Sequence, residues 1–187
     1  MRRTPRGPDR ERTFTALYEA VYPDLLRFVQ RRARAEHAED VVAEAFLVVW
    51  RRLDELPRDQ DDARAWVFGV ARHVLLNADR GEHRRRALGV RLASAGPHDV
   101  SDAPADGVVD RLDLSRAWAA LPDAHQEVLA LAVLDGVTGP QAAAVLGITP
   151  VAFRLRLSRA RRVLRQNLDH EPQRATTPAG LTGRTTP

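Results

Sequence analysis

The stretch TGPQAAAVLGITPVAFRLRLSRARRVL, residues 138–164, carries the signals of two short helices joined by a tight turn. Thr138 and Gln141 have the spacing of a capping box, in which a hydroxyl and a side-chain amide satisfy backbone N–H groups at the start of a helix. Gly147 supplies the left-handed residue that ends this helix, and Thr149, with a proline after it, caps the next. Two short helices joined by a turn that contains glycine predict a helix-turn-helix.

The second helix of this motif has an inward apolar stripe and an outward face suited to a DNA groove. The inward stripe consists of Phe153, Leu157, Ala160 and Leu164. On the opposite side, small and apolar residues lie between arginines; small side chains permit close approach, and arginine can bond guanine through two hydrogen bonds. We predict that this face binds DNA, with its N-terminal turns toward the bases, through Val151, Ala152, Arg154, Leu155, Ser158, Arg159 and Arg162. Towards the C-terminal end, Arg161, Arg162 and Arg165 are expected to contact phosphate.

Charge is distributed unevenly along the chain. All 29 basic residues are arginine, and the formal net charge is only +4. Residues 36–62 hold nine acidic residues and three arginines, whereas residues 150–168 hold six arginines and no acidic residue. The basic segment suits a nucleic-acid partner, and a merely solvated helix face is the alternative interpretation.

Composition divides the 187 residues into two helical parts. Residues 1–12 and 169–187 are polar and contain helix-breaking residues, so they are expected to be disordered. Residues 87–108 are rich in glycine and proline and predict a flexible linker, which could extend to roughly 75 Å. The predicted fold is all-α, with two small helical domains at residues 13–86 and 109–168, the second containing the helix-turn-helix.

The first domain is expected to hold several amphipathic helices. The first of these is punctuated at Pro23, and later helices are predicted over residues 39–53 and 63–80. With a step of about 100° per residue, four residues of the 39–53 helix fall together on the side opposite its apolar stripe. These four are Asp40, Glu44, Leu47 and Arg51.

The composition also disfavours several classes of function. The chain has no cysteine, which excludes disulfides and thiolate metal sites. No apolar run approaches the length of a membrane span, and the N-terminus does not resemble a secretory signal, so we expect a cytoplasmic protein. The six histidines lack metal-binding spacing, and there is no phosphate-binding glycine loop or nucleophile elbow. We expect no catalytic activity, no metal site and no cofactor.

Several stretches, in this order, resemble the extracytoplasmic-function (ECF) sigma factors of bacteria. Those in the first domain are FTALYEAVYPDLLRFVQRRA, AEDVVAEAFLVVWRRLDEL and ARAWVFGVARHVLLNADRGEHRRR. Those in the second are WAALPDAHQEVLALAVLDGVTGPQAAAVLGI and RLRLSRARRVL. The resemblance implies a sigma factor that binds core RNA polymerase and directs promoter-specific initiation. Its first domain would recognise the −10 element and open the strands, and its second would recognise the −35 element.

The resemblance also implies partners and contact residues. The face with Asp40, Glu44, Leu47 and Arg51 matches the surface that docks on the clamp helices of the largest polymerase subunit. The flap of the second-largest subunit, promoter DNA and an anti-sigma factor are the other expected partners.

Contacts with the −10 element are expected from a loop and the helix after it. The loop over residues 56–63 matches the family's segment that captures a flipped-out base, although it is unusually acidic for a DNA-facing segment. The predicted contacts are Arg58, Gln60, Arg64, Arg72, His73, Asn77, Arg80, Arg84 and Arg85, with Arg86 in the same basic run. Trp66 is expected in the core rather than as a stacking platform. Leu155 and Ser158 depart from the family's usual residues, which predicts an atypical −35 preference.

Two other functions stay open at this point. A stand-alone helix-turn-helix repressor or activator would share residues 138–168, but it would leave the acidic helix face without a role. A protein-interaction module, whose first domain binds only protein, is the other possibility. Binding to core RNA polymerase distinguishes a sigma factor from the repressor or activator.

Overall fold

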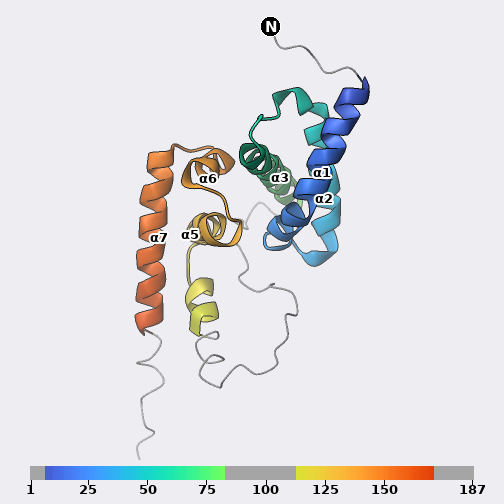
Figure 1. Ribbon diagram of the computed structural model, residues 1–187. Helices are drawn as coiled ribbons and strands as arrows, with labels where there is room; N and C mark the ends of the chain where they lie inside the picture. The colour runs from blue at the N-terminus through green and yellow to red at the C-terminus, as the bar shows by residue number, and fades with distance from the viewer. Residues whose placement is uncertain (1–6, 83–112, 171–187) are drawn as a thin grey trace, which may run out of the picture.

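The computed structural model describes residues 7–82 and 113–170, and all regular secondary structure within these ranges is helical (Figure 1). The N-terminal bundle, residues 7–82, contains α1 (Gly7–Gln30), α2 (Ala38–Arg51) and α3 (Gln60–Glu82), with 3-10 turns at Ala35–His37 and Leu53–Glu55. The C-terminal bundle, residues 113–170, contains a helix over 113–119, then α5 (Asp123–Leu129), a π-helical turn (Ala130–Leu134), α6 (Gly139–Leu146) and α7 (Pro150–His170).

The predicted all-α fold with two helical bundles is confirmed, and α6 and α7 form the helix-turn-helix. The predicted linker, residues 87–108, lies outside the described residues, as does the predicted tail beyond residue 170. The first two residues of that tail, 169 and 170, belong to α7 rather than to a disordered segment. Within the described ranges, no helix is both long enough and apolar enough to cross a bilayer.

The local signals of the helix-turn-helix are confirmed in the structure. The backbone N–H of Thr138 donates to the side-chain oxygen of Gln141 at 2.9 Å, which is one half of the capping box. Gly147 ends α6 with φ of 67°, a left-handed conformation that favours glycine. The backbone N–H of Ala152 donates to the hydroxyl of Thr149 at 3.1 Å, so Thr149 caps α7. The angle between the two helices is therefore set by short-range interactions.

The expected break at Pro23 is wrong, because α1 continues through this residue. A proline inside a helix costs about 3 kcal/mol through a lost hydrogen bond and a steric clash. Apolar residues on both sides of it, Val21 and Leu25, are fully or almost fully buried in the same core. The burial of one continuous apolar face outweighs the local cost of the proline.

The expectation of disorder over residues 1–12 is also wrong for its second half, since α1 begins at Gly7. Tertiary contacts fix this first part of the helix. Arg10 forms an ion pair with Asp54 at 3.0 Å, donates to the backbone oxygen of Trp50, and lies over the Trp50 ring at 5.1 Å from its centre. Composition alone does not reveal such partners, which lie about forty residues away.

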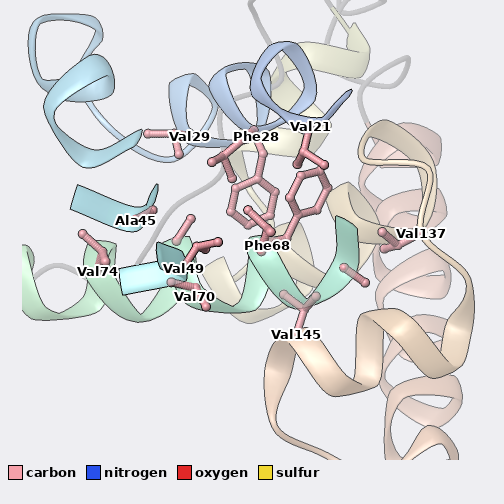
Figure 2. Packing of buried hydrophobic residues seen from close by; sticks show 14 of the residues in the cluster. Val21, Phe28, Val29, Ala45, Val49, Phe68, Val70, Val74, Val137 and Val145 are labelled. Carbon is pink, nitrogen blue, oxygen red and sulfur yellow. The ribbon is translucent and has the colours of Figure 1, made fainter. Parts of the chain in front are cut away.

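The core of the N-terminal bundle is centred on two stacked aromatic rings. Phe28 of α1 and Phe68 of α3 are both fully buried, with ring centroids 4.6 Å apart and planes inclined by 20°. Valines and alanines of α1, α2 and α3 surround this pair (Figure 2).

The same core continues into the C-terminal bundle. Val137 and Val145 are buried in one cluster with Phe68, and Figure 2 shows both valines on the side of α3 that faces α6. Gly69 lies at this contact, and a β-carbon placed on it would meet the Cα of Val145 at 3.8 Å, an ordinary van der Waals distance. The two bundles are therefore packed against each other through α3 and α6.

We expect Phe68→Ala to lower the free energy of unfolding by about 3–5 kcal/mol, because it removes a fully buried ring and leaves a cavity. Urea unfolding followed by circular dichroism measures this change. Leu155→Ala is the matched control, since this side chain is 55% exposed and its loss should cost less than about 0.5 kcal/mol. Equal losses for the two variants would contradict the placement of Phe68 at the centre of the core.

Candidate nucleic-acid interface

Helix α7 presents an apolar inner side and an exposed outer side. Phe153 and Ala160 are buried against the C-terminal bundle. On the outer side, Val151 is 56% exposed and Leu155 is 55% exposed. Arg154, Ser158, Arg159 and Arg162 are exposed as well, whereas Ala152 is partly buried. The structure thus brings the predicted −35 residues together along one helix, with Ala152 set slightly back at its capped start.

The outer side of α7 carries uncompensated positive charge. Among the described residues, none of the six arginines over 150–168 forms an ion pair with an acidic side chain. Arg165 donates instead to the backbone oxygen of Arg161 at 3.2 Å. Exposed aliphatic side chains beside free guanidinium groups are the combination that major-groove recognition uses, for thymine methyl groups and guanine edges respectively.

The outward face of α2 carries the four residues predicted to dock on a polymerase. Asp40, Glu44 and Arg51 are exposed, and Leu47 between them is 57% exposed. The opposite face of the helix is buried through Val42, Phe46 and Val49. A large apolar side chain exposed among charges is suited to a protein partner rather than to water alone.

The predicted −10 loop is shorter than expected, because α3 begins at Gln60 rather than after residue 62. Asp59 accounts for part of its acidity, since its side chain accepts the backbone N–H of Asp62 at 3.0 Å and so caps α3. Arg58 and Gln60 are exposed on this segment.

Arg52 lies beside the same loop and contacts both Glu55 and Trp66. Its Nε donates to Glu55 at 3.0 Å, and its hydrogen bonds lower the pKa of the Glu55 carboxyl. The Arg52 guanidinium also lies 5.6 Å from the ring centre of Trp66. Trp66 itself is partly buried and packs on the core, as expected.

The predicted −10 residues on α3 fall into two groups. His73 and Asn77 are exposed one turn apart, and the Nδ1 of His73 lies 2.8 Å from the backbone oxygen of Gly69. Arg64 and Arg72 are partly buried and face the C-terminal bundle. The Arg64 guanidinium donates to the backbone oxygen of Asp135 at 2.7 Å and pairs with Asp24 at 2.6 Å. Arg72 lies 3.7 Å from Glu127.

The remaining predicted −10 residues cannot be placed among these groups. The side chain of Arg80 lies outside the described residues, as do Arg84, Arg85 and Arg86. A groove of about 870 Å³ lies beside the residues that can be placed, between α2, α3 and α6. Its walls include Trp66, His73 and Asn77 from one bundle and Thr138 and Gln141 from the other.

A buried charge cluster between the bundles was not predicted from the sequence. The Arg32 side chain is fully buried, with its Nε 3.2 Å from Glu127 and an Nη 2.7 Å from Asp135. Its guanidinium lies 3.6 Å from the ring centre of Phe28. Arg31 pairs with Asp135 as well. The one sequence signal was a pair of acidic residues, Glu127 and Asp135, at the two ends of the apolar stretch 128–134, where a buried charge needs a partner.

Comparison with known families places two matches along this chain. Residues 17–86 match the family model of Sigma-70 region 2, and residues 111–164 match that of Sigma-70 region 4. The first match covers α2, α3 and most of α1, and the second covers the helix-turn-helix. The alternative of a stand-alone regulator is therefore wrong, because such a protein would have no sigma region 2.

Relatives and solved structures agree with these matches. The ECF RNA polymerase sigma factor SigL of Mycobacterium tuberculosis is 32% identical over 154 residues, which cover 82% of this chain and 87% of SigL. The RNA polymerase sigma factor CnrH of Cupriavidus metallidurans is 30% identical over 145 residues, covering 73% of this chain and 75% of CnrH.

Two solved structures share the fold. CnrH in complex with the cytosolic domain of CnrY aligns with a TM-score of 0.57 at 25% identity, covering 85% of this chain and 89% of that one. The sigma factor RpoE of Bartonella quintana, solved with the anti-sigma factor NepR, aligns with a TM-score of 0.63 at 22% identity, covering 85% and 98%. With both sigma regions matched in order and relatives at 30% identity or more along most of their length, this chain belongs to the ECF family of promoter-recognising RNA polymerase sigma factors.

Proposed function

We propose that this sigma factor divides its work among three surfaces. The outward face of α2 docks on the clamp helices of the largest polymerase subunit. The start of α3 and the loop before it contact the −10 element, and α7 reads the −35 element. The observation that carries this proposal is the outer side of α7, where exposed aliphatic side chains lie beside arginines without acidic partners.

Recognition of the −35 element rests on the chemistry of the α7 surface. Val151 and Leu155 are placed to contact thymine methyl groups, and Arg159 can bond a guanine through two hydrogen bonds, a contact worth about 1–3 kcal/mol of base discrimination. Arg162 and the arginines after it suit backbone phosphates. The Gly147 turn and the Thr149 cap fix where this helix begins, and the buried Phe153 and Ala160 pack it on the bundle.

Contact with the −10 element is assigned to Arg58 just before α3, to Gln60 at its start, and to four residues further along the helix: Arg64, Arg72, His73 and Asn77. Extraction of a base from the stack costs a few kcal/mol, which a protein offsets by stacking and by hydrogen bonds to the base edge. The wall of the groove that the N-terminal bundle contributes, with Trp66 and His73, offers aromatic and polar surface of the kind that such a base requires.

The polymerase and a regulatory protein complete the proposed set of partners. The flap of the second-largest subunit is the expected contact of the C-terminal bundle. Bond formation belongs to the polymerase, so we infer that this chain contributes no catalysis and works in the cytoplasm, where transcription takes place. The solved complexes of CnrH with CnrY and of RpoE with NepR support an anti-sigma factor as a further partner.

Asp40→Ala/Glu44→Ala should weaken binding to core RNA polymerase by about tenfold, because it removes two exposed charges beside Leu47. Binding is measured by fluorescence anisotropy of the labelled protein titrated with core enzyme. Glu39→Ala is the control, since this exposed acidic residue is rotated by about 100° from Asp40 around the axis of α2. If the double variant binds as tightly as Glu39→Ala does, the docking surface is elsewhere.

Arg159→Ala should lower transcription from a promoter with both elements by about tenfold, through loss of a base contact. The same variant should have little effect on a promoter whose −35 element is scrambled. Arg161→Ala removes an equal charge from the same helix, about 160° around the axis from Arg159. It should lower transcription from both templates by the same factor. In vitro transcription with reconstituted holoenzyme measures these ratios, and an Arg159→Ala defect of equal size on both templates would refute the assignment.

A further inference from the structure

The interface between the bundles concentrates charge that the proposed contacts do not explain. The N-terminal bundle contributes four guanidinium groups, here named the arginine cluster: Arg31, Arg32, Arg64 and Arg72. The C-terminal bundle contributes two buried carboxylates, Glu127 and Asp135. Each of the four arginines contacts one or both of these two residues. Glu127 and Asp135 therefore cover a surface of the N-terminal bundle on which, within the described ranges, four guanidinium groups have one acidic partner of their own bundle, Asp24, which pairs with Arg64.

The contacts within this cluster are only partly satisfied. Arg32 is well placed, with contacts to both carboxylates and a hydrogen bond to the backbone oxygen of Phe28 at 2.9 Å. By contrast, the Nε atoms of Arg31 and Arg72 are buried without a hydrogen-bond partner among the described residues. The approach of Arg72 to Glu127, at 3.7 Å, is longer than a hydrogen bond.

Such a cluster favours an interface that can separate. The desolvation of buried ion pairs can exceed the attraction between them, so they add little net stability when their hydrogen bonds are incomplete. Separation of the bundles would return the two carboxylates and the guanidinium groups of Arg31, Arg32 and Arg72 to water, whereas Arg64 would keep its ion pair with Asp24. The apolar contact of Phe68 with Val137 and Val145 then contributes most of the stability of the arrangement in which the two bundles are packed together, here called the closed packing.

Carboxylate and phosphate are interchangeable partners for arginine, because the planar guanidinium group bonds either of them through two parallel hydrogen bonds. Arg64 and Arg72 are also among the predicted −10 contacts. When the bundles are packed together, Arg64 donates to the backbone oxygen of Asp135 and Arg72 lies beside Glu127, so this packing and a DNA contact by the same two arginines exclude each other.

We propose that the arginine cluster is a binding surface for the phosphates of promoter DNA, and that Glu127 and Asp135 mask it in the free protein. Separation of the bundles on the polymerase exposes the cluster, to which Arg31 and Arg32 contribute in addition to the two arginines of α3. The inference rests on the proposed role of Arg64 and Arg72 in −10 contact. It adds to that role two further contact residues and a reason why the free chain would bind DNA weakly.

The absence of cysteine allows the packing to be measured directly. Spin labels at Ala20→Cys and Ala124→Cys lie on exposed positions of α1 and α5, one on each bundle. Pulsed electron paramagnetic resonance of the free protein should give one narrow distance distribution. Glu127→Gln/Asp135→Asn, which keeps side-chain size but removes both charges, should add a population at longer distances. It should also bind a fluorescent single-stranded −10 oligonucleotide about tenfold more tightly.

Three further variants make the test specific. Asp113→Asn/Asp169→Asn removes two acidic charges from the same bundle, in the helix over 113–119 and at the end of α7, and it should change neither readout. Adding Arg31→Gln/Arg72→Gln to the Glu127→Gln/Asp135→Asn variant should return oligonucleotide binding to the weak level of the parent protein. Circular dichroism checks the fold, and Arg32→Met in the N-terminal bundle should lengthen the distances too if the double carboxylate variant fails to fold.

An unchanged distance distribution in variants that keep their fold would overturn the proposal. Longer distances without tighter oligonucleotide binding would overturn it as well, since the cluster would then not bind phosphate. The −10 role of Arg64 and Arg72 is tested separately, by open-complex formation with holoenzyme carrying Arg64→Ala. Failure of masking and failure of the −10 assignment therefore give different results.

Discussion

The burial of Arg32 between Phe28 and two carboxylates is the interaction that joins the two halves of this protein. Its guanidinium group lies on an aromatic ring of the first core and reaches two acidic residues of the second bundle. A buried charge must be paired or it is very costly, so Arg32 needs both carboxylates as long as the two bundles are packed together. The apolar packing of α3 on α6 then excludes water around it.

The helix-turn-helix depends on local interactions, in contrast to this long-range pairing. A capping box, a left-handed glycine and a threonine cap fix α6 and α7 through residues a few positions apart. The α7 surface can therefore keep its shape whether the two bundles are packed together or apart. A recognition helix that keeps its shape while its bundle changes position suits a protein whose two promoter contacts are separated along DNA.

The contrast between local interactions in the helix-turn-helix and long-range pairing between the bundles also explains what could be predicted from the sequence. Helix caps, the two sides of α7 and the exposed face of α2 follow from neighbouring residues and helical periodicity, and they were predicted. The continuation of α1 through Pro23 depends on burial in the folded core, which outweighs the local cost. The ion pairs of Arg32 join residues 95 and 103 positions apart, and no periodic pattern reveals such a pairing. For the same reason, the partial burial of Arg64 and Arg72 could not be foreseen.

The central claim is that each bundle carries its own promoter contact and that both act together when polymerase carries the protein. Mapping of transcript 5′ ends tests it most directly, with core enzyme transcribing the genomic DNA of the source bacterium with and without this chain. The account predicts a set of new, discrete start sites that share two upstream sequence elements at a nearly constant separation. Start sites identical to those of core enzyme alone, or new sites that share only one element, would contradict it.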